Sequence, residues 1–580
     1  MTTSAERSSS YLLLAGLGLA FVLGVACGPR GEKAGAKDPA GKAPETAFRL
    51  EEATIAGLQE MMASGKETSE SIVALYLERI AAVDQAGPGL NAVIEVNPEA
   101  LSIARELDRE RREKGPRGPM HGIPVLIKDN IDTADRMETT AGSLALLGSK
   151  PARDAAVVER MRAAGAVILG KTNLSEWANF RSSRSTSGWS GRGGQTHNPY
   201  ALDRNPSGSS SGSGAAVSAN LAAVAVGTET DGSIVSPASC CGVVGLKPTV
   251  GLVSRSGIVP IAHSQDTAGP MARTVADAAI LLGAMTGPDP ADGATMAAGA
   301  RVFKDYREFL DRDGLRGARI GVMRSRAFNF GKALEPILDG AVEAMREAGA
   351  EIVDPVEIPT LGQTDDSEYE VLLYEFKADL EAYFAKRPGA AVRTLDDLIA
   401  FNERNAGREM PFFGQEILER AAKKGPLTDK AYLDALAKNR ELMRDKGIDA
   451  ALGAHKLDAL IMLTNGPAHL TDLVNGDSFS GSSSSPAAVA GYPTITLPAG
   501  WVHGLPVGVS LVGTAWSEPA LVRLAFGLER ALGEAAGGAG AATGGAVGAG
   551  AGRVGMRRPP RFLPTIQFGV QFGVGPQEVN

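Results

Sequence analysis

The segment GAAVSANLAAVAVGTETDGSI, residues 214–234, decides the fold class of this chain. Residues 214–222 predict a helix, residues 223–227 are a short continuous apolar run, and the remaining residues are mostly polar. A helix followed by such a run is typical of a buried strand in an α/β sheet. Residues 154–164 and the apolar run 166–169 repeat the pattern. The sequence therefore predicts an α/β/α layered domain, with the functional site in loops at the ends of strands.

The chain is long, weakly acidic and poor in aromatic residues. It has 580 residues, of which 44% are hydrophobic and 22% charged, with a formal net charge of -8 and a pI near 5.5. Nucleic-acid-binding proteins normally carry a basic face, so this balance argues against a nucleic-acid partner. Because the sequence has no H-E-x-x-H motif and no clustered Cys/His ligand set, we expect neither a metal nor another cofactor.

The N-terminus predicts a targeting segment. Tyr11–Ala26 is an apolar run, shorter than the ~20 residues that a membrane-spanning helix needs, and it suits a secretory signal. Small residues precede Cys27, as in bacterial lipoprotein signals, whose cysteine is lipidated. We therefore expect a signal peptide at residues 1–26, lipidation of Cys27, a flexible tether at residues 27–47, and an exported protein held on a bacterial membrane by its lipid alone. An ordinary cleaved signal, an uncleaved anchor and a cytoplasmic chain are the alternatives.

The rest of the chain predicts one domain and a low-complexity tail. Residues 48–532 contain no low-complexity gap. Residues 533–552 are almost entirely glycine and alanine, so we expect 533–580 to be a Gly/Ala-rich disordered run followed by a tail. Cys240 and Cys241 are adjacent, which rarely permits a disulfide, and both are expected to be small buried residues.

Two motif matches do not fit their physical context. GAVILGKT, residues 165–172, has the letters of a phosphate-binding loop, but a helix is expected before it and the residues between its glycines predict a strand. GSSSG, residues 208–212, fits the nucleophile elbow G-x-S-x-G with Ser210 at its centre. An elbow needs a preceding strand, which Pro206 disfavours, and a histidine base, for which only His503 lies downstream in a Gly-rich loop.

Two serines and a lysine predict an amide-cleaving site that needs no histidine. Cleavage of an amide requires an activated oxygen nucleophile, a proton carrier and donors for the oxyanion. Lys128 closes the apolar run 122–127, and burial there would favour the neutral form that a base requires. Ser209 lies in the glycine-serine block. Ser233 lies at a predicted helix N-terminus, whose free amides can hold an oxyanion, and Gly232 lets the backbone approach closely.

At these residues the chain resembles the amidase signature family, serine hydrolases with a Ser-Ser-Lys triad. The resemblance covers about Phe48 to Leu532 and implies a single large α/β/α domain with a central mixed β-sheet. The segments closest to the peptide amidase branch are GGQTHNPY (193–200), GTETDGSI (227–234), GLKPTVGLVSR (245–255), LTNGP (463–467) and SPAAVAGYP (485–493).

The resemblance implies a role for each site residue. Ser233 would be the nucleophile, Lys128 the base, and Ser209, after a cis peptide bond from Gly208, the relay between them. The family's oxyanion donors match the backbone amides of Thr230, Asp231, Gly232 and Ser233.

The sequence departs from the family pattern at two positions. Many members have glycine in place of Asp231, although peptide amidases tolerate the aspartate. Members that act on acidic substrates or on tRNA commonly have arginine in place of Val235, so the pocket should not favour a free carboxylate near the scissile amide.

The predicted function is hydrolysis of a carboxamide to a carboxylate and ammonia through an acyl-enzyme on Ser233. A C-terminal peptide amide, or a similar small-molecule amide, is the expected substrate. One alternative is the A component of a glutaminyl-tRNA amidotransferase, which would be cytoplasmic and need partner subunits. The other is a surface lipoprotein that keeps the fold as a binding module without activity.

Overall fold

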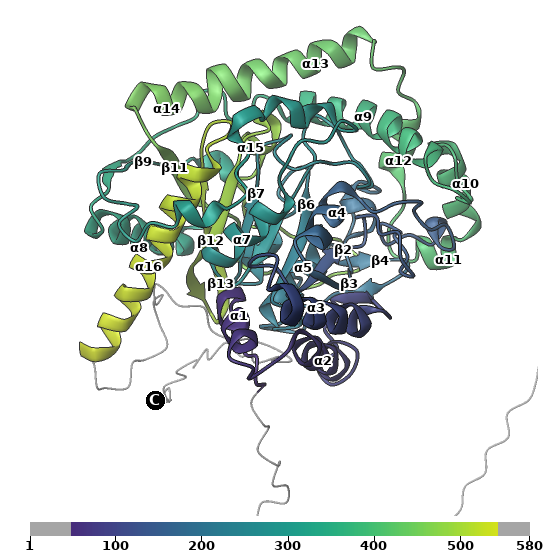
Figure 1. Cartoon of the computed structure of the whole chain (residues 1–580). Coiled ribbons are helices and arrows are strands. Elements are labelled where there is room, and N and C mark those ends of the chain that lie inside the picture. Colours follow the sequence, from purple (N-terminus) through teal and green to yellow (C-terminus); the bar gives the residue numbers. More distant parts are fainter. Residues whose placement is uncertain (1–47, 543–580) are drawn as a thin grey trace, which may run out of the picture. The chain divides into compact units, whose positions relative to one another are not determined.

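An 11-stranded mixed sheet forms the centre of the body that begins at Leu50 (Figure 1). The computed structural model describes residues 48–542, with side chains to residue 534. In sheet order the strands are β1 (Val93–Val96), β3 (Val167–Thr172), β2 (Pro124–Lys128), β6 (Val224–Glu229), β8 (Thr267–Ala272), β7 (Val244–Lys247), β12 (Thr494–Val502), β13 (Leu505–Val512), β11 (Ala459–Leu463), β9 (Arg319–Val322) and β10 (Glu351–Val353). A separate ribbon pairs β4 (Trp189–Ser190) with β5 (Gly194–Gln195).

The strand pairing brings the ends of β2 and β6 together. β3, β2 and β6 are parallel neighbours, as are β11, β9 and β10, and every other pair in the large sheet is antiparallel. Val125 is in register with Val224, and Ile127 with Val226. Because parallel strands end at the same edge of a sheet, Lys128 lies beside the polar end of β6.

Helices pack against this sheet in two sets, which confirms the α/β/α arrangement (Figure 1). α5 and α6 contact each other and the central strands, while α16 contacts α7 and α8. The helices are α1 (Ile55–Ala63), α2 (Ser69–Arg79), α3 (Ala100–Lys114), α4 (Ala156–Ala163), α5 (Ser211–Ser218), α6 (Val235–Cys240), α7 (Val275–Met285), α8 (Glu335–Glu347), α9 (Asp365–Ala385), α10 (Leu395–Arg404), α11 (Ala406–Glu409), α12 (Glu416–Ala422), α13 (Lys430–Arg440), α14 (Asp449–His455), α15 (Ser485–Ala490) and α16 (Glu518–Ala542).

Small residues let α5 lie in the interior. Every residue of this helix is buried. A Cβ at Gly212 would lie 2.3 Å from the Ala92 carbonyl oxygen and 2.7 Å from the Asn173 nitrogen, closer than packed atoms allow. The glycine-serine block is therefore required by packing as well as by any chemistry at its serines.

The expected elements are present with shifted ends. The helix predicted at 214–222 corresponds to α5, and the strand predicted at 223–227 corresponds to β6. β6 continues through Thr228 and Glu229 because both polar side chains have buried partners, Lys128 Nζ for Thr228 and the Ile234 N–H for Glu229. The apparent phosphate-binding loop is largely strand β3, preceded by α4, so this match has no phosphate-loop geometry.

Several expectations concern the ends of the chain. The signal peptide at 1–26, the lipidation of Cys27, the tether at 27–47 and residues 543–580 lie outside the described residues. The boundary expected at residue 532 falls inside α16, which ends at Ala542, and alanine favours this continuation of a helix. Between residues 48 and 542, no helix is long and apolar enough to cross a membrane. Cys240 and Cys241 are buried free thiols, as expected.

Candidate active site

Lys128 is a fully buried lysine at the carboxyl end of β2. Its Nζ lies 2.7 Å from Ser209 Oγ, 2.9 Å from the Thr228 hydroxyl and 3.3 Å from the Thr228 carbonyl oxygen. Burial lowers the pKa of Lys128 from 10.5 to about 7, against smaller opposing effects of the Asp266 and Glu229 carboxyls. A large fraction of the side chain is therefore neutral near pH 7.

A neutral amine matches these three contacts. It has two N–H donors and one lone pair, whereas the charged ammonium has donors only. The carbonyl and hydroxyl oxygens of Thr228 accept the two N–H bonds, and the lone pair is left for the proton of the Ser209 hydroxyl. Asn130 Nδ2 donates to the same Thr228 hydroxyl at 3.0 Å and holds it in place. Lys128 is thus arranged to take a proton from Ser209.

Ser209 is held rigidly beside this amine. It is 1% exposed, and its carbonyl oxygen accepts a hydrogen bond from the Ser175 N–H at 3.1 Å. The Gly208–Ser209 peptide bond is cis, as the family resemblance implies. A Cβ at Gly208 would lie 2.3 Å from Ser175 Oγ, so a larger residue here would displace the Ser175 side chain.

The loop of residues 230–233 joins β6 to α6 and contains the expected oxyanion donors. Glu229 Oε2 accepts the first two N–H groups after Ser233, at 2.7 and 3.0 Å. Among the residues that the structure describes, the N–H groups of Asp231, Gly232 and Ser233 donate to no other group. Gly232 has a φ of 77°, a backbone conformation that favours glycine. The loop therefore presents consecutive free amides, which can bind an oxyanion.

Ser233 lies against the glycine-serine block. Its carbonyl oxygen accepts a hydrogen bond from the Ser210 N–H at 3.1 Å. Its side chain belongs to a residue that is 7% exposed, and within the described part of the chain its hydroxyl makes no hydrogen bond. The structure thus brings the segments of Lys128, Ser209 and Ser233 together and leaves the Ser233 hydroxyl uncommitted.

The nucleophile-elbow alternative does not fit the geometry around Ser210. This hydroxyl donates to the Thr228 carbonyl oxygen at 3.0 Å, and no strand leads directly into the block. His503 is exposed, and His469 contacts Asp477 at 3.2 Å instead. None of the histidines in the described range contacts Ser210, so a histidine base has no support there.

Three further residues contact the site and were not predicted from the sequence, namely Thr228, Glu229 and Asp266. The Thr230 hydroxyl donates to Asp266 Oδ1 at 2.5 Å, and burial raises the pKa of Asp266 to about 6. Thr228 and Glu229 stand in the motif itself, where their polarity at the end of an apolar run was a usable signal. Asp266 lies beside Thr230 because β8 pairs antiparallel with β6, a contact between distant segments that the local sequence does not show.

A cavity of about 640 Å³ gives access to this region. Among the residues that line it are Thr228 and Thr230, at the end of β6, and Tyr383 and Arg387 of the α9 region. Its lining includes acidic and basic side chains. The cavity is large enough for a peptide-sized group to reach the loop that carries Ser233.

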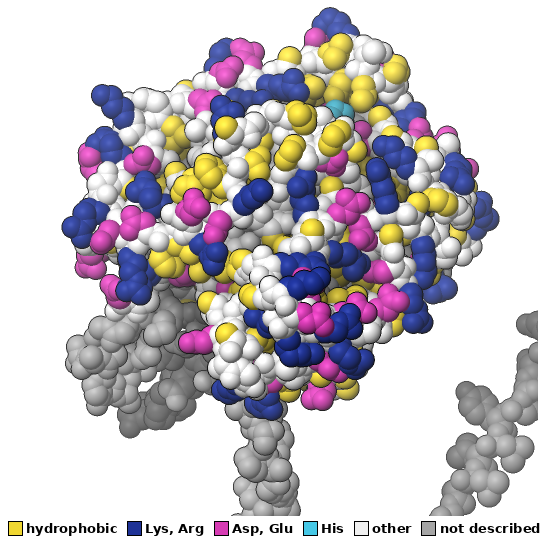
Figure 2. Space-filling model, in the orientation of Figure 1, with side chains coloured by type: hydrophobic (Ala, Val, Ile, Leu, Met, Phe, Trp, Pro, Cys, Tyr) yellow, Lys and Arg dark blue, Asp and Glu magenta, His cyan; other side chains and the backbone are white. Residues whose placement is uncertain are grey.

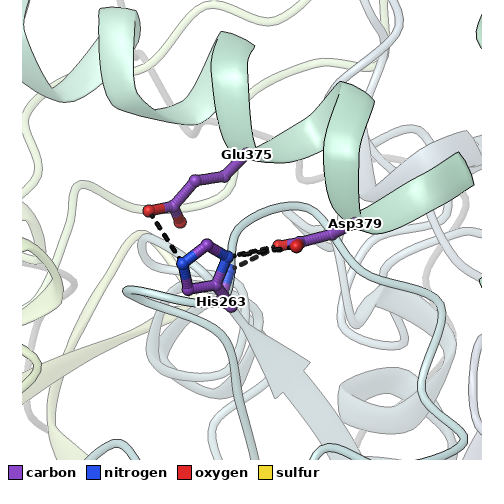
Figure 3. A group of neighbouring side chains, drawn as sticks. All are labelled: His263, Glu375 and Asp379. Atoms are coloured by element: carbon purple, nitrogen blue, oxygen red, sulfur yellow. Dashed lines mark hydrogen bonds and ion pairs between the residues drawn. The ribbon is translucent and has the colours of Figure 1, made fainter. Parts of the chain in front are cut away.

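His263 at the rim of this cavity lies between Glu375 and Asp379 of α9 (Figure 3). Nδ1 is 2.8 Å from Asp379, and Nε2 is 3.4 Å from Glu375. Although burial lowers the pKa of His263, the hydrogen bond to Asp379 raises it overall. Glu375 also accepts the Tyr432 hydroxyl at 2.7 Å. The side chains of His263, Glu375 and Asp379 contact one another, and the cluster connects the loop before β8 to α9.

Acidic and basic side chains are interspersed over the face of the molecule drawn in Figure 2. This face has no continuous basic surface of the kind that phosphate backbones require. It agrees with the acidic charge balance of the sequence.

Comparisons with known proteins agree with this geometry. The family described as Amidase matches residues 71–522, a range that includes every strand of the sheet. Native peptide amidase from Stenotrophomonas maltophilia has a solved structure that is 54% identical, with a TM-score of 0.80 over 83% of this chain and 97% of that chain. A probable amidase of Arabidopsis thaliana is 45% identical over 83% of this chain and 91% of its own length. The A component of the glutamyl-tRNA(Gln) amidotransferase of Caldanaerobacter subterraneus subsp. tengcongensis is 34% identical over 82% of this chain and 96% of its own length.

Proposed function

This chain belongs to the amidase family of amide-hydrolysing enzymes, and we propose that it hydrolyses the C-terminal carboxamide of a peptide, or a similar amide, to a carboxylate and ammonia. One observation carries the proposal. Lys128 Nζ lies 2.7 Å from Ser209 Oγ, inside a pocket that lowers the pKa of the lysine to about 7. This pair can activate an oxygen nucleophile without histidine or metal.

In the proposed first step, Ser233 Oγ attacks the amide carbon as its proton passes through Ser209 to neutral Lys128. The free amides of Asp231, Gly232 and Ser233 bind the oxyanion of the tetrahedral intermediate. The Lys128 ammonium then returns the proton through Ser209 to the amide nitrogen. The C–N bond breaks, ammonia leaves, and the acyl group remains as an ester on Ser233.

The second step repeats the proton path with water. Water attacks the ester carbon while its proton passes through Ser209 to Lys128, and the same amides bind the new oxyanion. Collapse of this intermediate breaks the ester bond, returns the proton from Lys128 to Ser233 and gives the carboxylic acid, which then loses its proton to the solvent to give the carboxylate. The enzyme is restored with no net change.

Similarity to a peptide amidase supports a peptide amide as the substrate. The amidotransferase component is a weaker match at 34% identity. Val235 also favours the first assignment, because it is apolar where family members that act on acidic substrates or on tRNA commonly have arginine. The inactive binding module is disfavoured because the three proposed catalytic residues are all present.

A substrate panel tests the proposal. Purified enzyme is incubated with peptide amides, side-chain amides such as glutamine, and anilides, and the amine released is measured. We expect the highest kcat/KM with peptide amides and no turnover by Ser233→Ala. Preferential hydrolysis of glutamine would favour the amidotransferase assignment, and release of no amine from any substrate would support the binding module.

We also propose that the protein is an exported lipoprotein. The apolar run Tyr11–Ala26, the small residues before Cys27 and the tether that follows support this location. Expression in a bacterium should give a membrane-bound form that detergent extracts, and Cys27→Ala should block its processing. An intact Met1, or an unmodified N-terminus at or beyond Gly28 in mass spectrometry, would exclude lipidation without affecting the proposed chemistry.

A further inference from the structure

A second cavity, of about 360 Å³, borders Asp231 of the loop that carries Ser233. Part of its wall is apolar, and the side chains in this part are Phe328, Leu361, Leu372, Met443 and Pro486. The charged residues that line it are all acidic, namely Asp231, Asp365 and Glu368. Neither lysine, arginine nor histidine is among the lining residues, whereas the larger cavity has Arg255 and Arg387 in its lining.

Two of these carboxyls lie close together, Asp231 in the nucleophile loop and the buried Glu368 on α9. Glu368, on α9, is 9% exposed, and its Oε1 accepts a hydrogen bond from Gln265 Nε2 at 2.9 Å. The same Gln265 nitrogen lies 3.3 Å from the Thr230 carbonyl oxygen. Burial raises the pKa of both Asp231 and Glu368, and the neighbouring Asp231 raises that of Glu368 further.

Among the described residues, no lysine, arginine or histidine forms an ion pair with Asp231 or Glu368, although the charge of Lys247 lowers the pKa of Asp231. Ser485 Oγ donates to Asp231 Oδ2 at 2.7 Å, and Ser484 and the Glu368 carboxyl lie within hydrogen-bonding reach of the same group, whereas no fixed donor lies within hydrogen-bond distance of the buried Asp231 Oδ1. Two carboxyls this close repel each other when both are ionised. A cation between them would supply donors to the free oxygens and compensate the charge.

We propose that this cavity is the substrate subsite for a positively charged group, an ammonium or a guanidinium, of the amide that Ser233 cleaves. The inference rests on the proposed function and adds the class of substrate. The apolar wall fits the methylene stem of such a group, and the carboxyls of Asp231, Glu368 and Asp365 fit its charged end. Amides with a basic residue at the scissile end are therefore the preferred substrates.

Three related amides test the subsite. N-acetyl-lysinamide carries a side-chain cation, N-acetyl-norleucinamide lacks it, and unblocked norleucinamide carries only an α-ammonium. We expect wild-type kcat/KM to be about tenfold higher for N-acetyl-lysinamide than for N-acetyl-norleucinamide. Glu368→Gln and Asp365→Asn should each reduce this preference, measured in each variant as the ratio of kcat/KM for the cationic amide to that for the neutral amide. Glu370→Gln is the matched control, because Glu370 lies on the same helix but pairs with Lys424 at 2.6 Å and lines neither cavity.

The outcomes separate the subsite from the proposed function. If unblocked norleucinamide shows the preference that Glu368→Gln removes, the cation is the α-ammonium. Equal wild-type rates on cationic and neutral amides, or a preference that survives Glu368→Gln, would overturn the subsite and leave the amidase proposal standing. Dissociation constants of the same amides for Ser233→Ala give a readout without turnover. A tenfold difference there that is lost in Ser233→Ala/Glu368→Gln would support the subsite even if no amide were hydrolysed.

Discussion

Lys128 and Lys247 are both fully buried lysines at the ends of strands, yet their surroundings differ in kind. Lys128 Nζ lies among two hydroxyls and one carbonyl oxygen, from Ser209 and Thr228. Lys247 Nζ donates to the carbonyl oxygen of Tyr492 at 2.6 Å. Burial lowers both pKa values, to about 7 and about 8. Burial alone therefore does not make a base, because a base also needs a hydroxyl proton within reach.

The charges around the two lysines differ as well. The Glu229 and Glu518 carboxyls act on Lys247 and oppose the lowering of its pKa, and Glu518 also accepts the Thr249 N–H at 2.6 Å. Lys247 therefore compensates buried carboxyls in the core, while Lys128 is positioned for proton transfer. The comparison predicts that changes at Lys128 affect catalysis and changes at Lys247 affect stability.

The largest expected effect is on turnover. Ser233→Ala should abolish acylation, and Lys128→Ala should lower kcat by about 10⁴-fold, since residues of one proton relay act as a unit. Ser209→Ala should fall between them. Steady-state kinetics on a peptide amide, with circular dichroism to confirm folding, gives the measurement. Near-wild-type activity of Lys128→Ala would remove the distinction between the two lysines.

A smaller effect is expected from Lys247→Met, and it should appear in stability. The substitution removes the charged donor to the Tyr492 carbonyl oxygen and a cation that acts on the Glu229 and Glu518 carboxyls, and it should cost about 2 kcal/mol, as is typical of a hydrogen bond to a charged group. Urea unfolding measures this change, and kcat of the folded protein should fall far less than in Lys128→Ala. An unchanged urea midpoint together with a thousandfold loss of activity in Lys247→Met would contradict the assignment of Lys247 to stability.

The pH profile should follow Lys128. The neutral form is the base, so kcat/KM should fall about tenfold per pH unit as the pH drops below about 7. The acid limb should persist in Lys247→Met and in His503→Ala, since neither side chain touches Ser209. A limb that disappears in His503→Ala would instead indicate a histidine base.

The smallest effect is expected from Asn130→Ala, which removes one hydrogen bond to the Thr228 hydroxyl. One such bond contributes about 1 kcal/mol, so kcat should fall about fivefold. Thr228→Val removes the hydroxyl itself and should cost more. Equal rates for Asn130→Ala and the wild type would show that Lys128 does not depend on this support.

Local patterns in the sequence predicted the residues of the proposed site but not its surroundings. The GTETDGSI segment and the glycine-serine block are short motifs, so Ser209 and Ser233 could be found from neighbouring letters. Three lysines each follow an apolar run, and the local sequence does not show which of them is the base: Lys128, Lys171 and Lys247. Lys171 donates to the Ile131 carbonyl oxygen at 2.6 Å, away from both serines.

The remaining features depend on contacts between distant segments. The order of β2, β6 and β8 in the sheet decides which lysine faces Ser209 and places Asp266 beside Thr230. The approach of α9 decides that Glu368 meets Asp231. No local periodicity encodes such pairings, which follow from the packing of the whole domain.

The most direct test of the account is to locate the acyl group. A slowly hydrolysed active ester, or a serine-directed fluorophosphonate, is reacted with the enzyme, and the modified residue is assigned by fragment-ion mass spectrometry. The account predicts a single adduct on Ser233, absent from Ser233→Ala and formed much more slowly by Lys128→Ala. An adduct on Ser210, or one that forms at the same rate without Lys128, would contradict it.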